Sequence, residues 1–295
     1  MATVVRNGNG HRLRPWRGFE PDQLETFRAD DGTVLVLRRW EARGPRHGDI
    51  LVFHGAGAHG GLYEPFAAEL ATRGWSVWVP DLRGHGASGG RKGDVERFER
   101  YARDAAPLAE RMAEPRFLWG ESMGGLVALE LALEQPGSWQ GVVLSAPALL
   151  LVREMSRPVR LLGRVASRLV PRLTAPLLGR GEMPGLPPGT LGREFTVRWG
   201  MEVVRAGEAL AARAPELRVP SLWLLPGADP LVDEERVAAL ARSVPGATIR
   251  LYPGYPHAIL TGPEPVAVVA SSTAWLEAQG REGSPAGAAG GVSPS

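Results

Sequence analysis

The sequence predicts an α/β protein with a mostly parallel central sheet, helices on both faces and an inserted helical cap. The first observation is alternation, because short runs rich in β-branched and aromatic residues take turns with helical segments. The second is composition, since a chain of 295 residues that is 44% hydrophobic and 22% charged can bury a large core. The third is one long interruption, in which helical periodicity continues without a strand.

The β-rich runs fit strands because they are short, apolar and bounded by turn residues. The sequence DDG at 30–32 lies between the first two runs and predicts a hairpin. The predicted strands are 24–29, 34–40, 49–54, 75–80, 116–119, 141–146, 219–227 and 247–252.

The segments between these strands have the spacing of amphipathic helices. Gly74 ends the first of them, and the sequence QPG stops the third. The predicted helices are 62–74, 95–113, 123–135, 232–244 and 263–279. Strands separated by helices indicate a mostly parallel sheet that is covered on both faces.

Residues 148–215 interrupt this pattern and are dense in Pro, Gly and Arg. They predict a helical cap, or lid, over the carboxyl edge of the sheet, where ligands bind in open α/β sheets. The core is then expected at 19–147 and 216–280. Residues 1–18 and 281–295 carry few apolar groups, so we expect a flexible N-terminal segment and a disordered C-terminal tail.

Composition also excludes several classes of function. The formal charge of +2 gives no strong attraction to a polyanion, so no nucleic acid partner is expected. The chain has no cysteine, which excludes disulfides, thiolate metal sites and a cysteine nucleophile. Its first residues lack the apolar core of a signal peptide, and no run of about 18 apolar residues is present. We therefore expect a cytoplasmic protein.

The sequence GESMG at 120–124 places one serine between two glycines, after a predicted strand and before a predicted helix. This context is the one that a G-x-S-x-G nucleophile motif requires. Reversing from strand to helix in so few residues strains the backbone at Ser122, so its neighbours two positions away need almost no side chain. The following helix also points its positive end at this position. We interpret Ser122 as a nucleophile; the alternative is an ordinary glycine-rich turn.

A serine nucleophile needs a base, and the base needs an orienting acid. Of six histidines only His257 follows Ser122, which is the chain order that this motif predicts. Asp229 lies at the carboxyl tip of a predicted strand and is the expected acid. Asp233 is its competitor, but its position suits the acidic first turn of the next helix.

The oxyanion formed by serine attack needs fixed hydrogen-bond donors. One expected donor is the backbone N–H of Met123, and the other is that of Ala56 in the sequence HGAG. His54 ends a buried strand and His85 lies in a glycine-rich loop, so we interpret both as structural groups.

Four segments together resemble the monoacylglycerol lipase/lysophospholipase group of α/β-hydrolases, which is similar to the serine aminopeptidase-type hydrolases. The likeness spans about 50–280, and GESMGG, with Glu121, resembles the plant and bacterial members. The four segments are HGAGAHGGLYEPFAAELATRGWSVWVPDLRGHGASGG, FLWGESMGG, LRVPSLWLLPGADPLVD and GYPHAI.

The resemblance implies the α/β-hydrolase fold and a serine esterase that hydrolyses single-chain acyl esters beneath a mobile cap, with no metal and no cofactor. Residue by residue, it implies that Ser122, Asp229 and His257 are the catalytic triad. It also implies that Ala56 and Met123 are the oxyanion donors.

The cap contains one strongly amphipathic segment. Its apolar face could line an acyl tunnel while its basic face contacts anionic lipid headgroups; the alternative is a solvated basic face. The basic residues are Arg160, Arg164, Arg168 and Arg172, and the apolar ones are Val159, Leu162, Val165, Ala166 and Leu169.

The sequence thus predicts a serine hydrolase that cleaves carboxylic esters of lipophilic monoacyl substrates, above all monoacylglycerols, through an acyl-enzyme. The alternatives among enzymes are a general carboxylesterase, a lysophospholipase and an acyltransferase. An alternative of another class is a non-hydrolytic ligand-binding protein with the same fold. The sequence makes no prediction of the oligomeric state.

Overall fold

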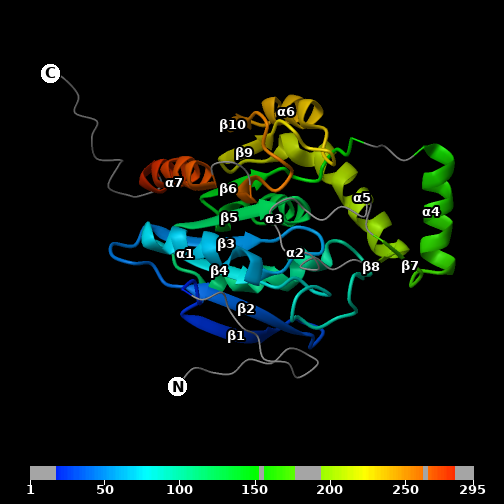
Figure 1. Cartoon of the computed structure of the whole chain (residues 1–295), viewed down its shortest axis with the longest axis horizontal. Helices are drawn as coiled ribbons and strands as arrows, with labels where there is room; N and C mark the ends of the chain where they lie inside the picture. The colour runs from blue at the N-terminus through cyan, green and yellow to red at the C-terminus, as the bar shows by residue number, and fades with distance from the viewer. Residues whose placement is uncertain (1–17, 153–155, 177–193, 262–264, 283–295) are drawn as a thin grey trace.

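A computed structural model describes residues 18–152, 156–176, 194–261 and 265–282 (Figure 1). Most of the two expected terminal segments lies outside the described residues. Within the described part, eight strands form one sheet in the order β1-β2-β4-β3-β5-β6-β9-β10. Their bounds are β1 Gln23–Arg28, β2 Val34–Trp40, β3 Gly48–Phe53, β4 Trp75–Pro80, β5 Arg116–Glu121, β6 Gly141–Ser145, β9 Ser221–Pro226 and β10 Ala247–Tyr252.

The sheet is mostly parallel, as the sequence predicts. The predicted hairpin is confirmed, because β1 pairs with β2 in antiparallel register. β2 is also antiparallel to β4, whereas the pairs from β4 to β10 are parallel. Strands β3, β4, β6 and β9 are buried at every residue, which is the pattern of parallel strands that are covered on both faces.

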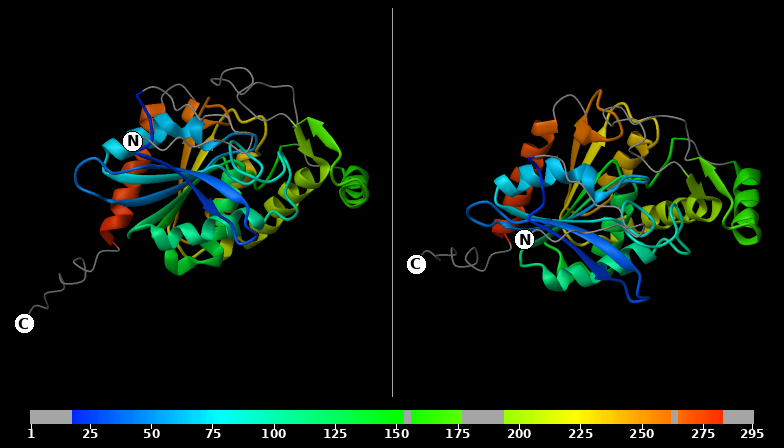
Figure 2. Two further views of the ribbon diagram at one scale, coloured as in Figure 1. Left: turned by 90° about the horizontal axis from the view of Figure 1, so that it is seen from below. Right: turned by 60° about the horizontal axis from the view of Figure 1, so that its bottom comes forward.

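Helices cover both faces of this sheet, which confirms the α/β-hydrolase arrangement (Figures 1 and 2). Residues of α1 and α7 share one apolar core with the sheet, and residues of α2, α3 and α6 share the other. The bounds are α1 Glu64–Thr72, α2 Arg100–Ala105, α3 Met123–Glu134, α6 Glu234–Arg242 and α7 Pro265–Glu282. Among the described residues, no helix is long and apolar enough to cross a membrane.

The helix predicted at 95–113 is shorter than expected. Val95 and Phe98 are buried in the loop before it, and α2 begins only at Arg100. From Ala106 the chain continues as a 3-10 turn, η2 Ala106–Arg111. Pro107 accounts for this change, because it has no N–H to continue the α-helical hydrogen bonds.

Between β6 and β9 the described chain holds two α-helices and two short strands, and the division into core and cap stays a prediction. The helices are α4 (Arg157–Leu169) and α5 (Val197–Arg213), but the prediction of an insertion without strands is wrong. Two three-residue strands, β7 Thr174–Pro176 and β8 Glu194–Thr196, pair in antiparallel register. Asp94 of the core connects to β8 and to the start of α5. It accepts a hydrogen bond from the Thr196 hydroxyl at 2.6 Å and forms an ion pair with Arg198.

Helix α4 lies at the outer edge of the molecule, beyond α5 (Figures 1 and 2). It packs on α5 through Gly163, which lies against Met201, and through an ion pair from Arg160 to Glu208. Its apolar side chains point into the solvent instead: Leu162 is 69% exposed and Leu169 is 76% exposed. The expectation that this face lines an acyl tunnel is therefore wrong for the described structure.

Glu130 on α3 is a buried acid with a consequence for stability. The side chain is buried, and its Oε2 atom has no hydrogen-bond partner within the described ranges. Burial raises the pKa of this carboxyl to about 7, and the nearby charges of Glu99 and Glu134 act in the same direction. Ionisation of Glu130 therefore costs the folded state free energy.

We expect Glu130→Gln to remove this cost. Below pH 4.5, the ordinary pKa of this carboxyl, Glu130 is protonated in the folded and in the unfolded protein. Its burial then costs the folded state no free energy of ionisation. As pH rises to about 7 the unfolded state loses its proton first, so the free energy of unfolding falls by up to about 3 kcal/mol. Urea unfolding at pH 5 and pH 8 should show the variant more stable than the wild type by about 1–3 kcal/mol at pH 8 only. Equal curves for the two proteins at both pH values would contradict the prediction.

Candidate active site

Ser122 lies at the turn between β5 and α3. Its backbone has a φ of 54° and a ψ of −117°, a strained combination for a residue with a side chain. A Cβ atom on Gly120 would lie 2.1 Å from the carbonyl oxygen of Gly124, and one on Gly124 would lie 2.2 Å from that of Phe53. The motif therefore needs glycine at both positions, because the turn presses β5, α3 and β3 into backbone contact.

Backbone hydrogen bonds hold the strained turn. The N–H of Ser122 donates to Ser145 O at 2.9 Å, next to the end of β6. The carbonyl of Ser122 accepts from Gly125 N at 3.0 Å and from Ala148 N at 3.1 Å. Because these partners lie on two neighbouring elements, the Ser122 hydroxyl is fixed relative to the whole carboxyl edge of the sheet.

Asp229 and His257 form the second part of the site. They follow β9 and β10, which are parallel neighbours, so both residues lie at the same edge as Ser122. Nδ1 of His257 lies 2.6 Å from Oδ2 of Asp229. The carboxylate side chain is 0% exposed, and its Oδ1 accepts the N–H groups of Leu231 and Val232 at 2.8 and 3.0 Å. The acid therefore has a fixed orientation toward the imidazole.

The structure does not join Ser122 to His257 by a hydrogen bond. Nε2 of His257 is buried and has no partner in the described part of the chain. Catalytic hydrogen bonds are commonly long before substrate binds. The charges of His257 and Asp229 both act on Glu121, the residue before Ser122, which indicates that the three segments converge. The triad role of these residues stays a prediction.

Asp233, the competitor for the acid, is occupied elsewhere. It is the N-cap residue of α6 and accepts the N–H of Arg236 at 3.1 Å. An N-cap carboxylate satisfies a free helix donor and suits the helix dipole. This observation favours Asp229 as the acid.

The two expected oxyanion donors belong to segments next to the serine. Met123 is the first residue of α3, where N–H groups have no acceptor within the helix. Ala56 follows Gly55, and a Cβ atom on Gly55 would lie 3.4 Å from Cβ of Ser122. The loop after β3 therefore approaches the hydroxyl closely enough to supply a second donor. Their role as donors is a prediction that the geometry fits.

His54 and His85 are structural, as predicted. His54 is buried, accepts the N–H of Leu82 at 3.0 Å and places Nδ1 2.9 Å from Gly55 O. Burial lowers the pKa of His54 to about 3 and that of His85 to about 4. Both imidazoles are therefore neutral near pH 7, and His54 ties the loop after β4 to the loop that carries Ala56.

Two groups near the site were not singled out for a role from the sequence. Asp81 after β4 is fully buried, pairs with Arg38 at 2.6 Å and accepts the N–H groups of Gly60 and Ala87 at 2.7 Å each. It holds the loops beside the site together. A DLRGHG segment that directly follows a strand was the available signal, because a buried aspartate there can cap several backbone donors.

The second unassigned group is Glu121, which is buried and is the last residue of β5, directly before Ser122. It accepts a hydrogen bond from the Tyr63 hydroxyl. Burial raises the pKa of the Glu121 carboxyl, and the charge of Asp229 acts in the same direction, whereas the Tyr63 hydrogen bond and the charge of His257 lower it. In the sequence, Glu121 contributes to the family resemblance, but no pattern there predicts a role for it.

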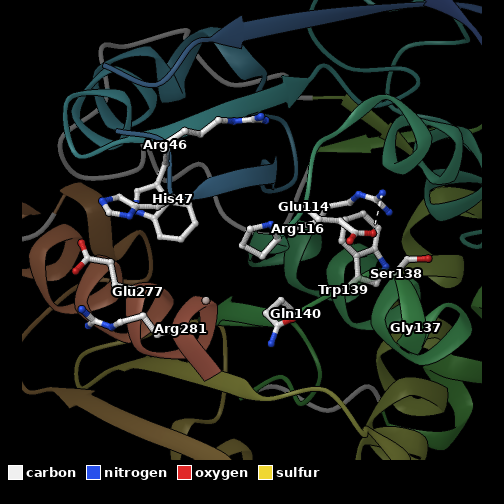
Figure 3. A pocket seen from close by; sticks show the side chains of 13 residues that line it. Arg46, His47, Glu114, Arg116, Gly137, Ser138, Trp139, Gln140, Glu277 and Arg281 are labelled. Carbon is white, nitrogen blue, oxygen red and sulfur yellow. Dashed lines mark ion pairs between the residues drawn. The ribbon is translucent and has the colours of Figure 1, made fainter. Parts of the chain in front are cut away.

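A cavity of about 560 Å³ lies at the opposite edge of the sheet (Figure 3). Its wall comes from α7 and from residues at or just before the amino ends of β3, β4, β5 and β6, at the edge opposite to the carboxyl ends that carry Ser122. Arg116 and Glu114 in this wall form an ion pair at 3.2 Å, and Arg46 pairs with Asp49. The cavity is therefore separate from the candidate site at the carboxyl edge. In the described ranges, no three His, Asp or Glu residues are placed to hold a metal ion.

Comparisons with known proteins indicate the family of the chain. The sequence matches the family described as serine aminopeptidase, S33, over residues 44–185 and 188–264. The human monoglyceride lipase is 31% identical over 247 residues, which cover 78% of this chain and 81% of that protein. The monoacylglycerol lipase of Mycolicibacterium smegmatis is 24% identical, with 85% and 95% covered. The crystal structure of Paleococcus ferrophilus monoacylglycerol lipase superposes with a TM-score of 0.74 at 26% identity, covering 83% and 99%.

We expect Gly124→Ala to destabilise the fold by more than about 3 kcal/mol, because the new methyl group would overlap the Phe53 carbonyl inside a rigid contact. The matched control is Gly200→Ala in α5, where nothing lies within 4 Å of the added Cβ. That change should stabilise the protein by about 0.5–1 kcal/mol. Urea unfolding measures both, and a Gly124→Ala protein as stable as the wild type would be the contrary result.

Proposed function

The chain belongs to the serine aminopeptidase S33 family of α/β-hydrolases and is an ester hydrolase, and we propose that it cleaves lipophilic monoacyl esters through an acyl-enzyme on Ser122. Monoacylglycerols are the preferred substrates in this proposal. The observation that carries it is the pairing of a hydroxyl on a strained strand–helix turn with a buried imidazole–carboxylate pair at the same sheet edge. The relatives named as monoglyceride lipases support the choice of substrate.

In the proposed reaction, Nε2 of His257 takes the proton of Ser122 while Oγ attacks the ester carbonyl. Asp229 holds Nδ1 of His257 and stabilises the imidazolium that forms. The N–H groups of Ala56 and Met123 stabilise the oxyanion. The imidazolium then protonates the leaving alcohol, which leaves an acyl-enzyme. Water that loses its proton to His257 hydrolyses this ester and restores Ser122.

We also propose that α4 rests transiently on an anionic lipid surface. Its apolar side chains are exposed on the side away from α5, and none of its residues is buried. Arg164 and Arg168 are exposed beside them and form no ion pair within the described ranges. An exposed apolar face flanked by arginines is typical of helices that lie in a membrane interface. Docking there would bring the site to its lipophilic substrate.

We expect Ser122→Ala to lower turnover of a monoacylglycerol by at least about four orders of magnitude, because the acyl-enzyme cannot form. Asp229→Asn should lower it by about three to four orders of magnitude, since the imidazole loses its acceptor and its orientation. Asp233→Asn is the matched control, because asparagine also caps a helix. It should keep activity near that of the wild type.

Turnover assays of the three variants test these assignments. A fluorophosphonate should label the wild type and not Ser122→Ala. Wild-type protein without labelling and without a burst on a chromogenic ester would favour the non-hydrolytic binding protein. Assays on monoacylglycerols, lysophospholipids and short p-nitrophenyl esters decide between the lipase, the lysophospholipase and the general esterase. Transfer of the acyl group to added alcohol would indicate an acyltransferase.

We expect the double variant Leu162→Ser/Leu169→Ser to bind vesicles of phosphatidylglycerol and phosphatidylcholine at least about tenfold more weakly than the wild type. Each leucine would otherwise bury its side chain in the lipid. The control is Val266→Ser, a valine that is also exposed and belongs to α7, a helix on the opposite side of the molecule from α4 (Figure 1).

Cosedimentation measures the binding, and hydrolysis of a short water-soluble ester should be the same in all three proteins. Wild-type protein that does not sediment with the vesicles would contradict membrane docking. Self-association that the double variant abolishes would assign the surface to a second copy of the chain instead.

A further inference from the structure

A second cavity, of about 680 Å³, has walls from the core and from the insertion between β6 and β9. Such a volume is in the range of small-molecule sites. None of the candidate triad residues lines it. Seven arginines and four acids line it, so positive groups outnumber negative ones. Whether the cavity can hold an anion depends on which of these charges are already paired.

Backbone contacts hold the core wall of this cavity against the insertion. Thr196 N–H donates to Gly93 O at 2.9 Å, and a Cβ atom on Gly93 would lie 2.0 Å from the carbonyl oxygen of Glu194. The same loop turns at Arg91, whose carbonyl accepts the N–H of Asp94 at 3.2 Å. The loop that carries Arg91 therefore lies directly on β8.

The turn after α4 is attached in the same way on the insertion side. Val197 N–H donates to Leu173 O at 2.8 Å. Arg198 N–H donates to Pro171 O at 3.4 Å. Both donors belong to the first turn of α5. Arg172 lies between the two acceptors in the chain, so its backbone position relative to the cavity is fixed.

Four of the seven arginines are already neutralised by ion pairs. Their carboxylate partners are ionised near pH 7; hydrogen bonding by Arg83, for example, holds the pKa of Asp31 well below its ordinary value. The pairs are Arg83 with Asp31 and Asp104, Arg97 with Glu99 and Glu202, Arg100 with Asp30, Asp31 and Asp104, and Arg198 with Asp94.

The other three arginines are Arg91, Arg103 and Arg172. All three side chains are exposed and form no ion pair within the described ranges. They come from three segments: the loop after β4, helix α2 and the turn after α4. Glu96 is the one acid of the wall without an ion pair among the described residues. The unpaired groups therefore leave an excess of positive charge, and like charges that share a cavity repel one another.

We propose that this cavity binds a phosphate group, of a lipid headgroup or of a soluble phosphate ester, through Arg91, Arg103 and Arg172. A guanidinium group can donate two parallel hydrogen bonds to phosphate oxygens. A phosphate monoester carries a charge of about −1.5 to −2 at pH 7, which offsets the excess that the unpaired arginines create. Because these arginines belong to the core and to the insertion, the bound phosphate connects the two and relieves their repulsion.

Isothermal titration calorimetry with glycerol 1-phosphate tests the site, at one fixed ionic strength because salt screens exposed charges. We expect the wild type to bind this ester and not glycerol. The triple variant Arg91→Gln/Arg103→Gln/Arg172→Gln should bind it at least about tenfold more weakly, since hydrogen bonds to a charged group are lost. The three side chains are exposed and unpaired within the described ranges, so the variant should unfold at nearly the same temperature as the wild type.

The matched control is Arg218→Gln/Arg242→Gln/Arg281→Gln, which removes the same charge from exposed positions outside this cavity. It should bind the ester as the wild type does. Arg281 lines the cavity at the opposite edge, so the control also reports binding there. Glu96→Gln should bind the ester at least about twofold more tightly, because a negative charge beside the ligand is removed.

Vesicles of phosphatidylcholine with phosphatidic acid identify the source, since they present the same monoester at a lipid surface. If the triple variant cosediments with them less than the control does, the ligand is a lipid headgroup. If the two cosediment equally and the triple variant alone loses glycerol 1-phosphate, the ligand is a soluble ester. Wild-type protein that binds neither probe would overturn the proposal.

A control that loses as much binding as the triple variant would also overturn the proposal, as would weaker binding by Glu96→Gln. These measurements need no ester turnover. Their failure therefore leaves the proposed function intact, and an inactive wild type that binds the phosphate leaves this site intact.

Discussion

The reversal of the chain from β5 into α3 is the constraint on which the site depends. Three backbone segments meet there, and any Cβ atom on Gly120 or Gly124 would overlap a carbonyl oxygen. The strain at Ser122, with its φ of 54°, is tolerated because hydrogen bonds to Ser145 and Ala148 over-determine the turn. Strain of this kind costs of order 1–3 kcal/mol. The result of this strain is that Ser122 lies in a sharp turn at the carboxyl edge of the sheet.

The parallel strands bring the other candidate residues to the same edge of the sheet as Ser122. β5, β6, β9 and β10 are parallel and adjacent, so the loops after them open at one edge. Asp229 and His257 reach each other because β9 and β10 are neighbours, although they are 28 positions apart in sequence. Each loop then needs its own support. Asp229 accepts two backbone N–H groups. Asp81, which is paired with Arg38, likewise accepts the N–H groups of Gly60 and Ala87.

The sequence predicts the repeating parts of this architecture well, because apolar periodicity and turn residues determine them locally. Every core strand lies within a few residues of its predicted range, and Asp229 and His257 meet as predicted. What it missed depends on tertiary contacts. No local pattern indicates that Phe98 is buried in a loop. The break at Pro107, in contrast, had a local signal that the prediction of one helix over 95–113 did not use, because proline has no N–H. The periodicity of α4 reveals an apolar face, but the pattern cannot state whether that face meets the sheet or the solvent. The link from Glu121 to Tyr63 joins positions 58 apart, so only the fold could expose it.

The two ways in which the insertion is attached have different consequences for the site. At its root, Val152 N–H donates to Leu231 O at 3.0 Å and Leu150 O accepts Asp233 N–H at 2.9 Å, so the root shares peptide groups with the loop that orients Asp229. Helix α4, in contrast, makes its contacts chiefly with α5. A displacement of the root would therefore disturb the acid, whereas α4 can shift on α5 without moving it. This separation is compatible with the proposed docking of α4 on a lipid surface, because the contacts that orient Asp229 lie at the root of the insertion and not on α4.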